Sequence, residues 1–408
     1  MLPFPLNVKH HFDVLLPVLE ANASIAPSDF ALRIKPSELP IPVADVAHLL
    51  DCYQRARDKF PNIHRPKLLY TRKALEQSSS EALVKYKSNL IQGDIAVDLT
   101  GGLGMDTFAL SGQFKKVIYV EKDPNVVEIA RHNHEVLGCQ NITYVCEDAE
   151  TWLNSCTGTK FDLMYIDPSR RNEHGRQFLL KDCEPDVRLI LPQLYSLTKK
   201  LVVKVSPLYD IKQITRELPD IETIEVISVH NEVKEILVHC ALQEISVERE
   251  IRIKAVRLDK LGQMISMHVV EIDQSNYAIE TADQVGNYLY EPDAAIIKAG
   301  ITTSVGSVFN LQRVSDNSIY LTSEEFCPIF PGKSYEVSAI LPYKSKHIAA
   351  YLWEHQLEAV HIHKRDFPLK PEELFKKFNL RMGDQAHLFF TKDADGALIM
   401  ICAQLVEV

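Results

Sequence analysis

AVDLTGGLGMD, residues 96–106, decides the fold, because three glycines in four positions directly follow a run of apolar residues. The pattern predicts a strand over residues 95–99, a tight turn, and a helix over residues 106–111. Glycine tolerates positive φ and has no Cβ, so the backbone of such a turn can approach a neighbour closely. The free N–H groups of the following helix also favour negative charge. The turn therefore predicts a nucleotide-like ligand, with a tight turn and no ligand as the alternative.

The composition of the 408 residues is typical of a globular protein of two or three domains, with 46% hydrophobic and 25% charged residues. No apolar run is long enough for a membrane span, and the first residues lack the features of a secretory signal. The eight cysteines are scattered and form no C-x-x-C pair. They predict reduced thiols in a cytoplasmic protein without a zinc site. We expect neither a membrane nor a metal.

The net charge of −10 excludes a global basic field that would attract nucleic acid. Charge is uneven, however, because residues 342–381 hold eight Lys and Arg against five Asp and Glu. The basic cluster in this segment consists of Lys364, Arg365, Lys370, Lys376 and Lys377. Such a cluster is typical of a phosphate-binding face or of a solvated surface, and the sequence leaves both open.

The chain changes its pattern twice. Residues 1–75 have helical spacing with proline breaks, and a second helical run is predicted over residues 72–91, just before the glycine turn. Short apolar runs then alternate with helical segments, at residues 95–100, 117–123, 142–148, 161–167 and 201–207. This alternation predicts a parallel sheet covered by helices on both faces. Residues 222–230 and 235–242 close the run as an antiparallel pair, and residues 249–258 and 264–272 form a hairpin around the turn DKLG.

Acidic residues follow the first three predicted strands: Asp98, Glu121 and Asp148. Glu121 lies 19 residues beyond Gly102, a position suited to hydrogen bonding the hydroxyls of a ribose. Thr107 stands where a dinucleotide fingerprint needs its last glycine, which disfavours a nicotinamide-dependent oxidoreductase. Together with Asp-Pro after the fourth strand, this series resembles the class I S-adenosylmethionine-dependent methyltransferases.

The resemblance covers residues 72–242 and implies a Rossmann-like, seven-stranded sheet whose last strand is antiparallel. It implies S-adenosylmethionine as the cofactor. Glu121 would bind its ribose, Asp123 would lie beside it, and Asp148 would reach its adenine. The residues implied at the methionine end are Asp98, Thr100, Gly101, Gly102 and Gly104.

The segment YIDPSRR, residues 165–171, lies where this fold meets its acceptor. In the amino-methylating families the pattern is Asp or Asn, Pro, Pro and an aromatic residue. Here Ser169 replaces the second proline and Arg170 the aromatic residue, although an arginine plane can also stack or hold a phosphate. We expect Asp167, Pro168 and Ser169 at the acceptor, and Arg170 and Arg171 as anion contacts or as structural salt bridges.

A second set of residues points to a hydroxyl acceptor. Asp167, Lys204 and Glu235 fall where ribose 2′-O-methyltransferases carry three members of their Lys-Asp-Lys-Glu catalytic set. A lysine held near carboxylates can orient or deprotonate a hydroxyl. The alternative is a simple ion pair between Lys204 and Glu235. The upstream lysine stays open among Lys73, Lys85 and Lys87.

The region just upstream of the turn, residues 73–87, would lie across the cofactor pocket in this fold. Gln77 and the neighbouring serines would then contact the methionine moiety, unless the serines only cap a helix.

The C-terminal half resembles an uncharacterised bacterial methyltransferase family whose members end in ferredoxin-like and THUMP-like domains. The segments that carry this resemblance are residues 288–300, 330–346 and 363–391. We therefore divide the chain into a helical region (1–75), a methyltransferase domain (76–245), a ferredoxin-like α+β segment (246–329) and a THUMP-like domain (330–408). THUMP domains deliver RNA, so the resemblance implies RNA modification, at a base amino nitrogen or a ribose 2′-hydroxyl. The alternatives are a protein or small-molecule acceptor, and a non-catalytic RNA-binding scaffold.

Overall fold

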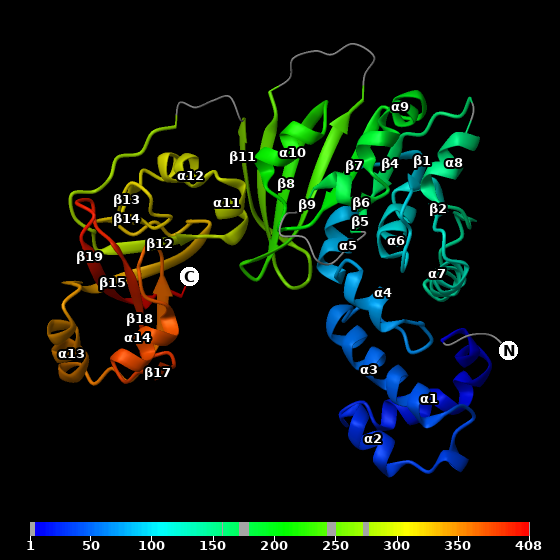
Figure 1. Ribbon diagram of the computed structural model, residues 1–408, viewed down its shortest axis with the longest axis horizontal. Coiled ribbons are helices and arrows are strands. Elements are labelled where there is room, and N and C mark those ends of the chain that lie inside the picture. Colours follow the sequence, from blue (N-terminus) through cyan, green and yellow to red (C-terminus); the bar gives the residue numbers. More distant parts are fainter. Residues whose placement is uncertain (1–4, 157, 171–178, 243–249, 272–276, 408) are drawn as a thin grey trace. The chain divides into compact units, whose positions relative to one another are not determined.

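The computed structural model describes residues 5–156, 158–170, 179–242, 250–271 and 277–407 (Figure 1). The chain divides into two compact units. The first comprises Met1–Ile224, Glu235–Arg249 and Leu258–Ile265, and the second comprises Glu225–Lys234, Glu250–Arg257 and Ser266–Val408. The boundary predicted near residue 245 lies outside the described residues.

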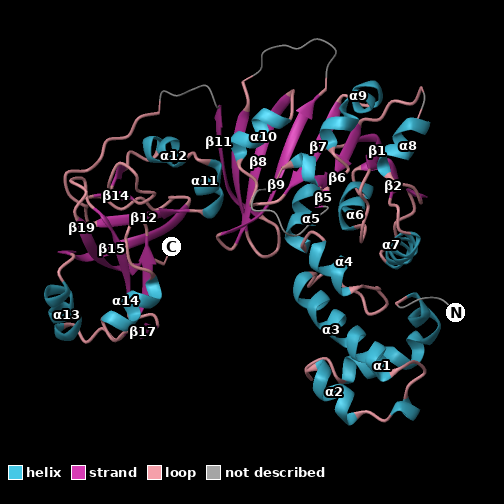
Figure 2. Cartoon of the chain, viewed as in Figure 1, coloured by secondary structure: helices cyan, strands magenta, loops and turns pink. Residues whose placement is uncertain are grey.

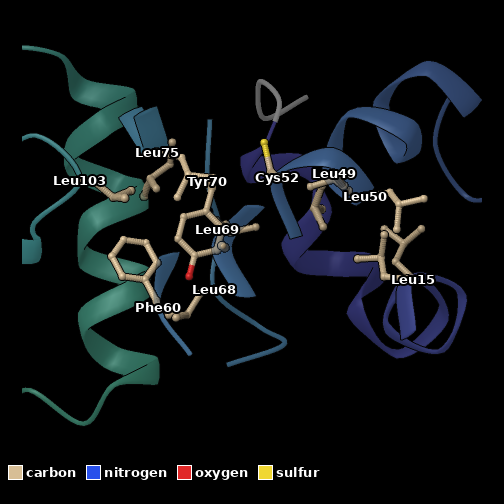
Figure 3. Close-up of a cluster of buried hydrophobic side chains, with 14 of the residues drawn as sticks. Leu15, Leu49, Leu50, Cys52, Phe60, Leu68, Leu69, Tyr70, Leu75 and Leu103 are labelled. Carbon is tan, nitrogen blue, oxygen red and sulfur yellow. The ribbon is translucent and has the colours of Figure 1, made fainter. Parts of the chain in front are cut away.

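The N-terminal region is helical, as predicted. Its elements are η1 (Leu6–His11), α1 (Phe12–Ala21), α2 (Pro27–Arg33), η2 (Pro36–Glu38), α3 (Val43–Lys59) and α4 (Arg72–Gln77). Apolar residues at helical spacing bury one face of α3, where Leu49 and Leu50 lie near Leu15 (Figure 3). Phe60, after the end of α3, belongs to the same extended cluster. The same cluster includes Leu103 of the glycine turn, so the helical region and the turn share one core.

The predicted single helical run over residues 72–91 is wrong, because Ser78–Ser80 separate α4 from α5 (Glu81–Lys87). Ser78 and Ser80 have extended backbone angles. Serine favours helix ends over helix interiors, so the helix does not continue through this segment. The break allows α5 to run beside α6 (Met105–Ser111), the helix that follows the glycine turn.

The expected methyltransferase sheet is present (Figure 2). Its seven strands run in the order β8-β9-β7-β4-β1-β2-β3, and β1 pairs in parallel with both β2 and β4. The final strand β9 pairs antiparallel with β7, as the resemblance implied. The strands are β1 (Gly93–Asp98), β2 (Phe114–Val120), β3 (Ile142–Val145), β4 (Leu163–Ile166), β7 (Lys200–Val205), β8 (Ile221–Val229) and β9 (Glu232–Ala241).

Helices connect these strands: α7 (Pro124–Val136), α8 (Ala149–Ser155), α9 (Val187–Leu197) and α10 (Ile211–Glu217). The short strands β5 (Ser169–Arg170) and β6 (Cys183–Glu184) pair with each other beyond β4, and η3 (Leu180–Asp182) precedes β6. Because parallel strands place their carboxyl ends at one edge, the turns after β1, β2, β3 and β4 meet there.

The predicted hairpin consists of β10 (Arg252–Leu258) and β11 (Met264–Glu271), joined by a turn in which Asp259 N–H donates to the Gln263 carbonyl. It extends the sheet beyond β8 to nine strands, so the sheet is larger than the predicted seven.

The rest of the second unit forms an eight-stranded sheet, in the order β13-β14-β12-β15-β19-β18-β16-β17. Its strands are β12 (Tyr288–Pro292), β13 (Gln312–Arg313), β14 (Leu321–Ser323), β15 (Gly332–Pro342), β16 (Ala359–Lys364), β17 (Arg381–Met382), β18 (Ala386–Lys392) and β19 (Leu398–Leu405). Its helices are α11 (Ala294–Ala299), α12 (Thr302–Val308), α13 (Ser345–Glu354) and α14 (Pro371–Lys377). Ile348 of α13 and Leu374 of α14 lie in one apolar cluster with the strands, so both helices pack on the sheet.

Candidate active site

Two of the three glycines in the turn make room for aromatic rings rather than for a ligand. A Cβ built on Gly101 would lie 2.1 Å from the ring of Tyr119, and one on Gly104 would lie 2.5 Å from the ring of His134. The Tyr119 hydroxyl donates to the Gly102 carbonyl at 2.6 Å, and the His134 Nε2 lies 2.8 Å from the Gly104 carbonyl. These two rings therefore brace the turn from inside the protein.

The His134 ring is held in one tautomer by its two neighbours. A carbonyl only accepts, so Nε2 carries the proton toward Gly104, and Nδ1 accepts from the Tyr144 hydroxyl at 3.0 Å. Burial lowers the pKa of His134 to about 4, which keeps the ring neutral.

Gly102 is the glycine that faces open space. Its φ is +50°, and a Cβ there would meet only the Thr100 carbonyl, at 3.8 Å. The Gly102 N–H donates to Glu121 Oε2 at 3.1 Å, while Glu121 Oε1 accepts from the Asp123 N–H at 2.9 Å. Glu121, the predicted ribose ligand, is thus placed beside the turn by backbone donors.

Asp98 and Thr100 hold the turn internally. Asp98 is 1% exposed, and its carboxylate accepts from the Thr100 N–H at 3.1 Å and from the Thr107 hydroxyl at 2.7 Å. Burial raises the pKa of Asp98 to about 7, against the effect of these two donors. The Thr100 hydroxyl in turn accepts from the Asp167 N–H at 2.7 Å, which ties the turn to the acceptor segment.

Asp123 and Asp148 each cap a helix. Asp123 accepts from the Asn125 N–H at the start of α7, and Asp148 accepts from both the N–H and the hydroxyl of Thr151 at the start of α8. The Thr151 donors lower the pKa of Asp148. Both carboxylates lie at the carboxyl edge of the sheet, as predicted, but the structure shows them in a capping role that the sequence reasoning did not assign.

A cluster of charged side chains lies next to the turn. Lys87 Nζ lies 2.5 Å from Asp106 Oδ1 and 3.1 Å from Glu235 Oε2. Lys204 Nζ lies 2.5 Å from Asp167 Oδ2 and 3.6 Å from Asp106 Oδ2. The structure therefore brings the three predicted residues Asp167, Lys204 and Glu235 together. Lys87 of α5 and Asp106 of α6 connect them.

Of the three candidate upstream lysines, Lys87 is the one that reaches the cluster. Its side chain is 4% exposed and enters the cluster from the end of α5, whereas Lys73 and Lys85 are exposed. Glu235 contacts Lys87, and Lys204 contacts Asp167, so the alternative of a simple pair between Lys204 and Glu235 does not describe the site.

Asp106 and Ser79 belong to the cluster and were missed as site residues. Asp106 lies in the first turn of α6, two residues beyond the last glycine, and it touches both lysines. The Ser79 hydroxyl lies 2.8 Å from Lys87 Nζ and 3.3 Å from Lys204 Nζ, at the break between α4 and α5. Of the segment expected to contact the methionine moiety, Ser79 thus contacts the two lysines of the cluster, and Gln77 is exposed.

The charged groups of the cluster shift one another's pKa values. Two lysines face three carboxylates, which leaves one negative charge in excess. Burial alone would lower the pKa of Lys204, but Asp167, Asp106 and Glu235 outweigh it and raise the pKa well above its usual range. Burial alone would raise the pKa of Asp106, but Lys87 and Lys204 reverse this and lower it. Burial outweighs the lysines at Asp167 and at Glu235, and raises the pKa of both.

Asp167 is the most open carboxylate of the cluster, with 34% of its side chain exposed. Ser169 follows it in β5 and pairs with Glu184 of β6, and Glu184 also pairs with Lys122 at 2.7 Å. Pro168 lies between them, partly buried. The side chain of Arg170 is not described, and Arg171 lies outside the described residues.

No cluster of three His, Cys, Asp or Glu side chains among the described residues could hold a metal ion. The described helices include none that is long and apolar enough to cross a membrane.

Family models match three parts of the chain. The model described as conserved hypothetical protein 95 matches residues 65–182. A ferredoxin-like domain model matches residues 288–331, and a THUMP domain-like model matches residues 332–404.

Related proteins match most of the chain. An uncharacterised S-adenosylmethionine-dependent methyltransferase of Mycobacterium tuberculosis is 25% identical over 343 residues, which cover 84% of this chain and 90% of that protein. A crystal structure described as a candidate methyltransferase from Porphyromonas gingivalis W83 is 28% identical, with a TM-score of 0.86 and full coverage of both chains. A segment of 115 residues is 29% identical to the 23S rRNA (uracil(1939)-C(5))-methyltransferase of Shewanella amazonensis, and covers 26% of this chain and 25% of that protein. The resemblance to methyltransferases and the fold class are confirmed.

Proposed function

We propose that this chain is an S-adenosylmethionine-dependent methyltransferase that modifies RNA at a ribose 2′-hydroxyl. The observation that carries the hydroxyl acceptor is the buried cluster in which Lys87, Asp167, Lys204 and Glu235 meet. These four residues complete the Lys-Asp-Lys-Glu set that ribose 2′-O-methyltransferases carry. The cluster lies directly beside the turn that would hold the methyl donor, because Asp106 belongs to both.

The turn fits the cofactor. Gly102 offers open space and a positive φ, and Glu121 places a carboxylate beside it for the ribose. When bound, S-adenosylmethionine supplies a methyl group activated by a positively charged sulfur. Tyr119 and His134 hold the turn rigid, so the residues that would contact the cofactor are positioned in advance.

The cluster supplies the chemistry at the acceptor. Lys204 stays protonated, so it holds the acceptor oxygen and stabilises negative charge there rather than removing a proton. Asp167 is the open carboxylate and has a raised pKa, which suits it to accept the proton that the acceptor hydroxyl would lose on methylation. Glu235 and Asp106 keep Lys87 and Lys204 in place.

Three observations support RNA as the acceptor. The C-terminal part matches a THUMP domain-like model, and a segment of the chain is similar to a ribosomal RNA methyltransferase. Residues 342–381 also carry an excess of positive charge in an acidic protein.

All eight cysteines are free, which agrees with a reducing, cytoplasmic location. We assign catalysis to residues 76–245 and RNA delivery to the C-terminal domains.

Calorimetric titration with S-adenosylmethionine, with NAD as the control, tests the cofactor. We expect micromolar binding of S-adenosylmethionine alone, and its loss in Glu121→Ala. Binding of NAD, or normal binding of S-adenosylmethionine by a folded Glu121→Ala variant, would contradict the proposed cofactor site.

Labelled methyl transfer to total RNA from a strain lacking the enzyme tests the acceptor. A 2′-O-methyl group blocks alkaline cleavage, so label in alkali-resistant dinucleotides is the expected result. Label in ordinary mononucleotides would instead support a base amino nitrogen, the second candidate, which the Asp167-Pro168 pair after β4 favours. Transfer to protein or small molecules but not to RNA would overturn the RNA acceptor.

A further inference from the structure

Helix α13 of the second unit exposes a tryptophan to an unusual degree. Trp353 is 84% exposed, whereas Trp152, the other tryptophan of the chain, is 8% exposed. The opposite face of α13 is used for packing, because Ile348 and Leu352 are buried in the apolar cluster under the helix. The exposure of Trp353 is therefore not a consequence of a poorly packed helix.

The outward face of α13 is basic at one end. Lys346, Ala350 and Trp353 lie at spacings of four and three residues, so they share one face of the helix. Ala349 and Ala350 are exposed and small, which leaves the Trp353 ring free of taller neighbours. Lys346 lies about 10 Å from Trp353 along the helix axis, at 1.5 Å per residue.

Further basic side chains lie at the start of α13. Lys344 and His347 are exposed there. The end of α14 lies beside them, since Lys377 Nζ donates to the Tyr343 hydroxyl at 2.9 Å and lies 4.9 Å from the centre of its ring. Lys376 is exposed next to Lys377. One acid, Glu354, follows Trp353 at the other end of the helix.

A free indole and a row of cations suit single-stranded nucleic acid, whose bases stack on aromatic rings while its phosphates pair with lysines. An apolar protein partner would need a wider apolar surface, whereas Trp353 shares its face of α13 with Lys346, Ala349 and Ala350. We propose that the outward face of α13 is a binding surface for single-stranded RNA, with Trp353 as the stacking platform and Lys344 and Lys346 as phosphate contacts. The proposal rests on the proposed function, because it specifies where the RNA acceptor is held.

Tryptophan fluorescence tests the platform directly, because Trp353 is the exposed tryptophan. We expect a short mixed-sequence oligoribonucleotide to quench the emission of the wild-type protein. Fluorescence anisotropy of a dye-labelled copy of this oligoribonucleotide gives the affinity. Trp353→Ala should bind about 10-fold more weakly, and Trp353→Phe should retain most of the affinity because a phenyl ring also stacks.

Two variants serve as further tests. Leu32→Ala removes another large apolar side chain, 87% exposed in the first unit, and should bind like the wild type. Lys346→Ala should reduce the slope of log affinity against log salt by about 0.7, the value for one phosphate contact on a single strand.

The outcomes separate this proposal from the one on which it rests. If the wild type binds RNA but Trp353→Ala binds equally well and no quenching occurs, the α13 surface is overturned while the RNA acceptor stands. If the wild type binds no RNA at any salt concentration, the RNA acceptor and the surface both fail, and calorimetry with S-adenosylmethionine still reports whether the cofactor site is correct.

Discussion

Lys87 illustrates how much one residue of the site depends on its partners. Its ammonium is buried between Asp106 and Glu235, so removing it takes the ion-pair partner from Glu235 and leaves Asp106 only the more distant Lys204, at 3.6 Å. We expect Lys87→Met to destabilise the protein by about 3–5 kcal/mol, the cost of breaking a buried ion pair from one side. Urea unfolding measures this as a lower midpoint.

Lys115→Met is the matched control. Lys115 pairs with Asp94 at 2.8 Å, but its side chain is 82% exposed, so the same substitution should change stability by less than about 1 kcal/mol. Equal midpoints for the two variants would mean that the Lys87 cluster is not buried in solution.

Asp98 makes stability depend on pH. Its pKa is about 7 in the folded protein and near 3.8 in the unfolded chain, so between these values the folded state binds the extra proton. The stabilisation from this group is therefore fully present below about pH 4 and is lost as the pH rises toward 7, by up to about 1.4 kcal/mol per unit. Asp98→Asn cannot titrate, so its stability relative to the wild type should improve over this range. Urea unfolding of both proteins at several pH values measures the difference, and a constant difference would contradict the burial of Asp98.

At the scale of elements, the turn between β1 and α6 and the rings beneath it form one unit. Gly101→Ala places a methyl group on the Tyr119 ring and would displace the hydroxyl that holds the Gly102 carbonyl. We expect a destabilisation of about 1–3 kcal/mol and weaker binding of S-adenosylmethionine. Thermal unfolding and calorimetry measure the two effects.

Gly112→Ala is the comparison for this change. Gly112 ends α6 with an ordinary negative φ, and its new Cβ would lie 3.8 Å from the Ala109 carbonyl, at normal contact distance. This variant should be neutral or slightly stabilising. If both glycine variants behave alike, the close packing of Tyr119 is not what requires Gly101.

The sequence predicted the elements better than their junctions. Strands such as β1 and β4 follow from short apolar runs, and the hairpin of β10 and β11 follows from DKLG, because these signals are local. The break at Ser78–Ser80 and the choice of Lys87 over Lys85 depend on Asp106 and Glu235, which are distant in sequence, so local patterns could not decide them. The same holds for Asp98, whose strand-end position was clear while its partner Thr107 was not.

At the scale of the whole molecule, the two compact units should contribute to different kinetic constants. Asp167 and Lys204 lie in the first unit, and the basic cluster of residues 364–377 lies in the second. We expect Asp167→Asn to lower kcat at least 100-fold, the effect of losing a general base, with little change in the KM for RNA.

Replacing Lys364, Lys370 and Lys376 together by alanine should have the opposite signature, because these residues are exposed and would contact phosphates without taking part in the reaction. The KM for RNA should rise about 10-fold or more, the salt dependence of binding should become weaker, and kcat and the affinity for S-adenosylmethionine should stay unchanged. Lys115→Ala combined with Lys116→Ala removes two exposed charges from β2 and should leave all four quantities as they are. A fall in kcat for the triple variant, with an unchanged KM, would contradict this division, since it would place the basic cluster in the chemical step rather than in holding the RNA.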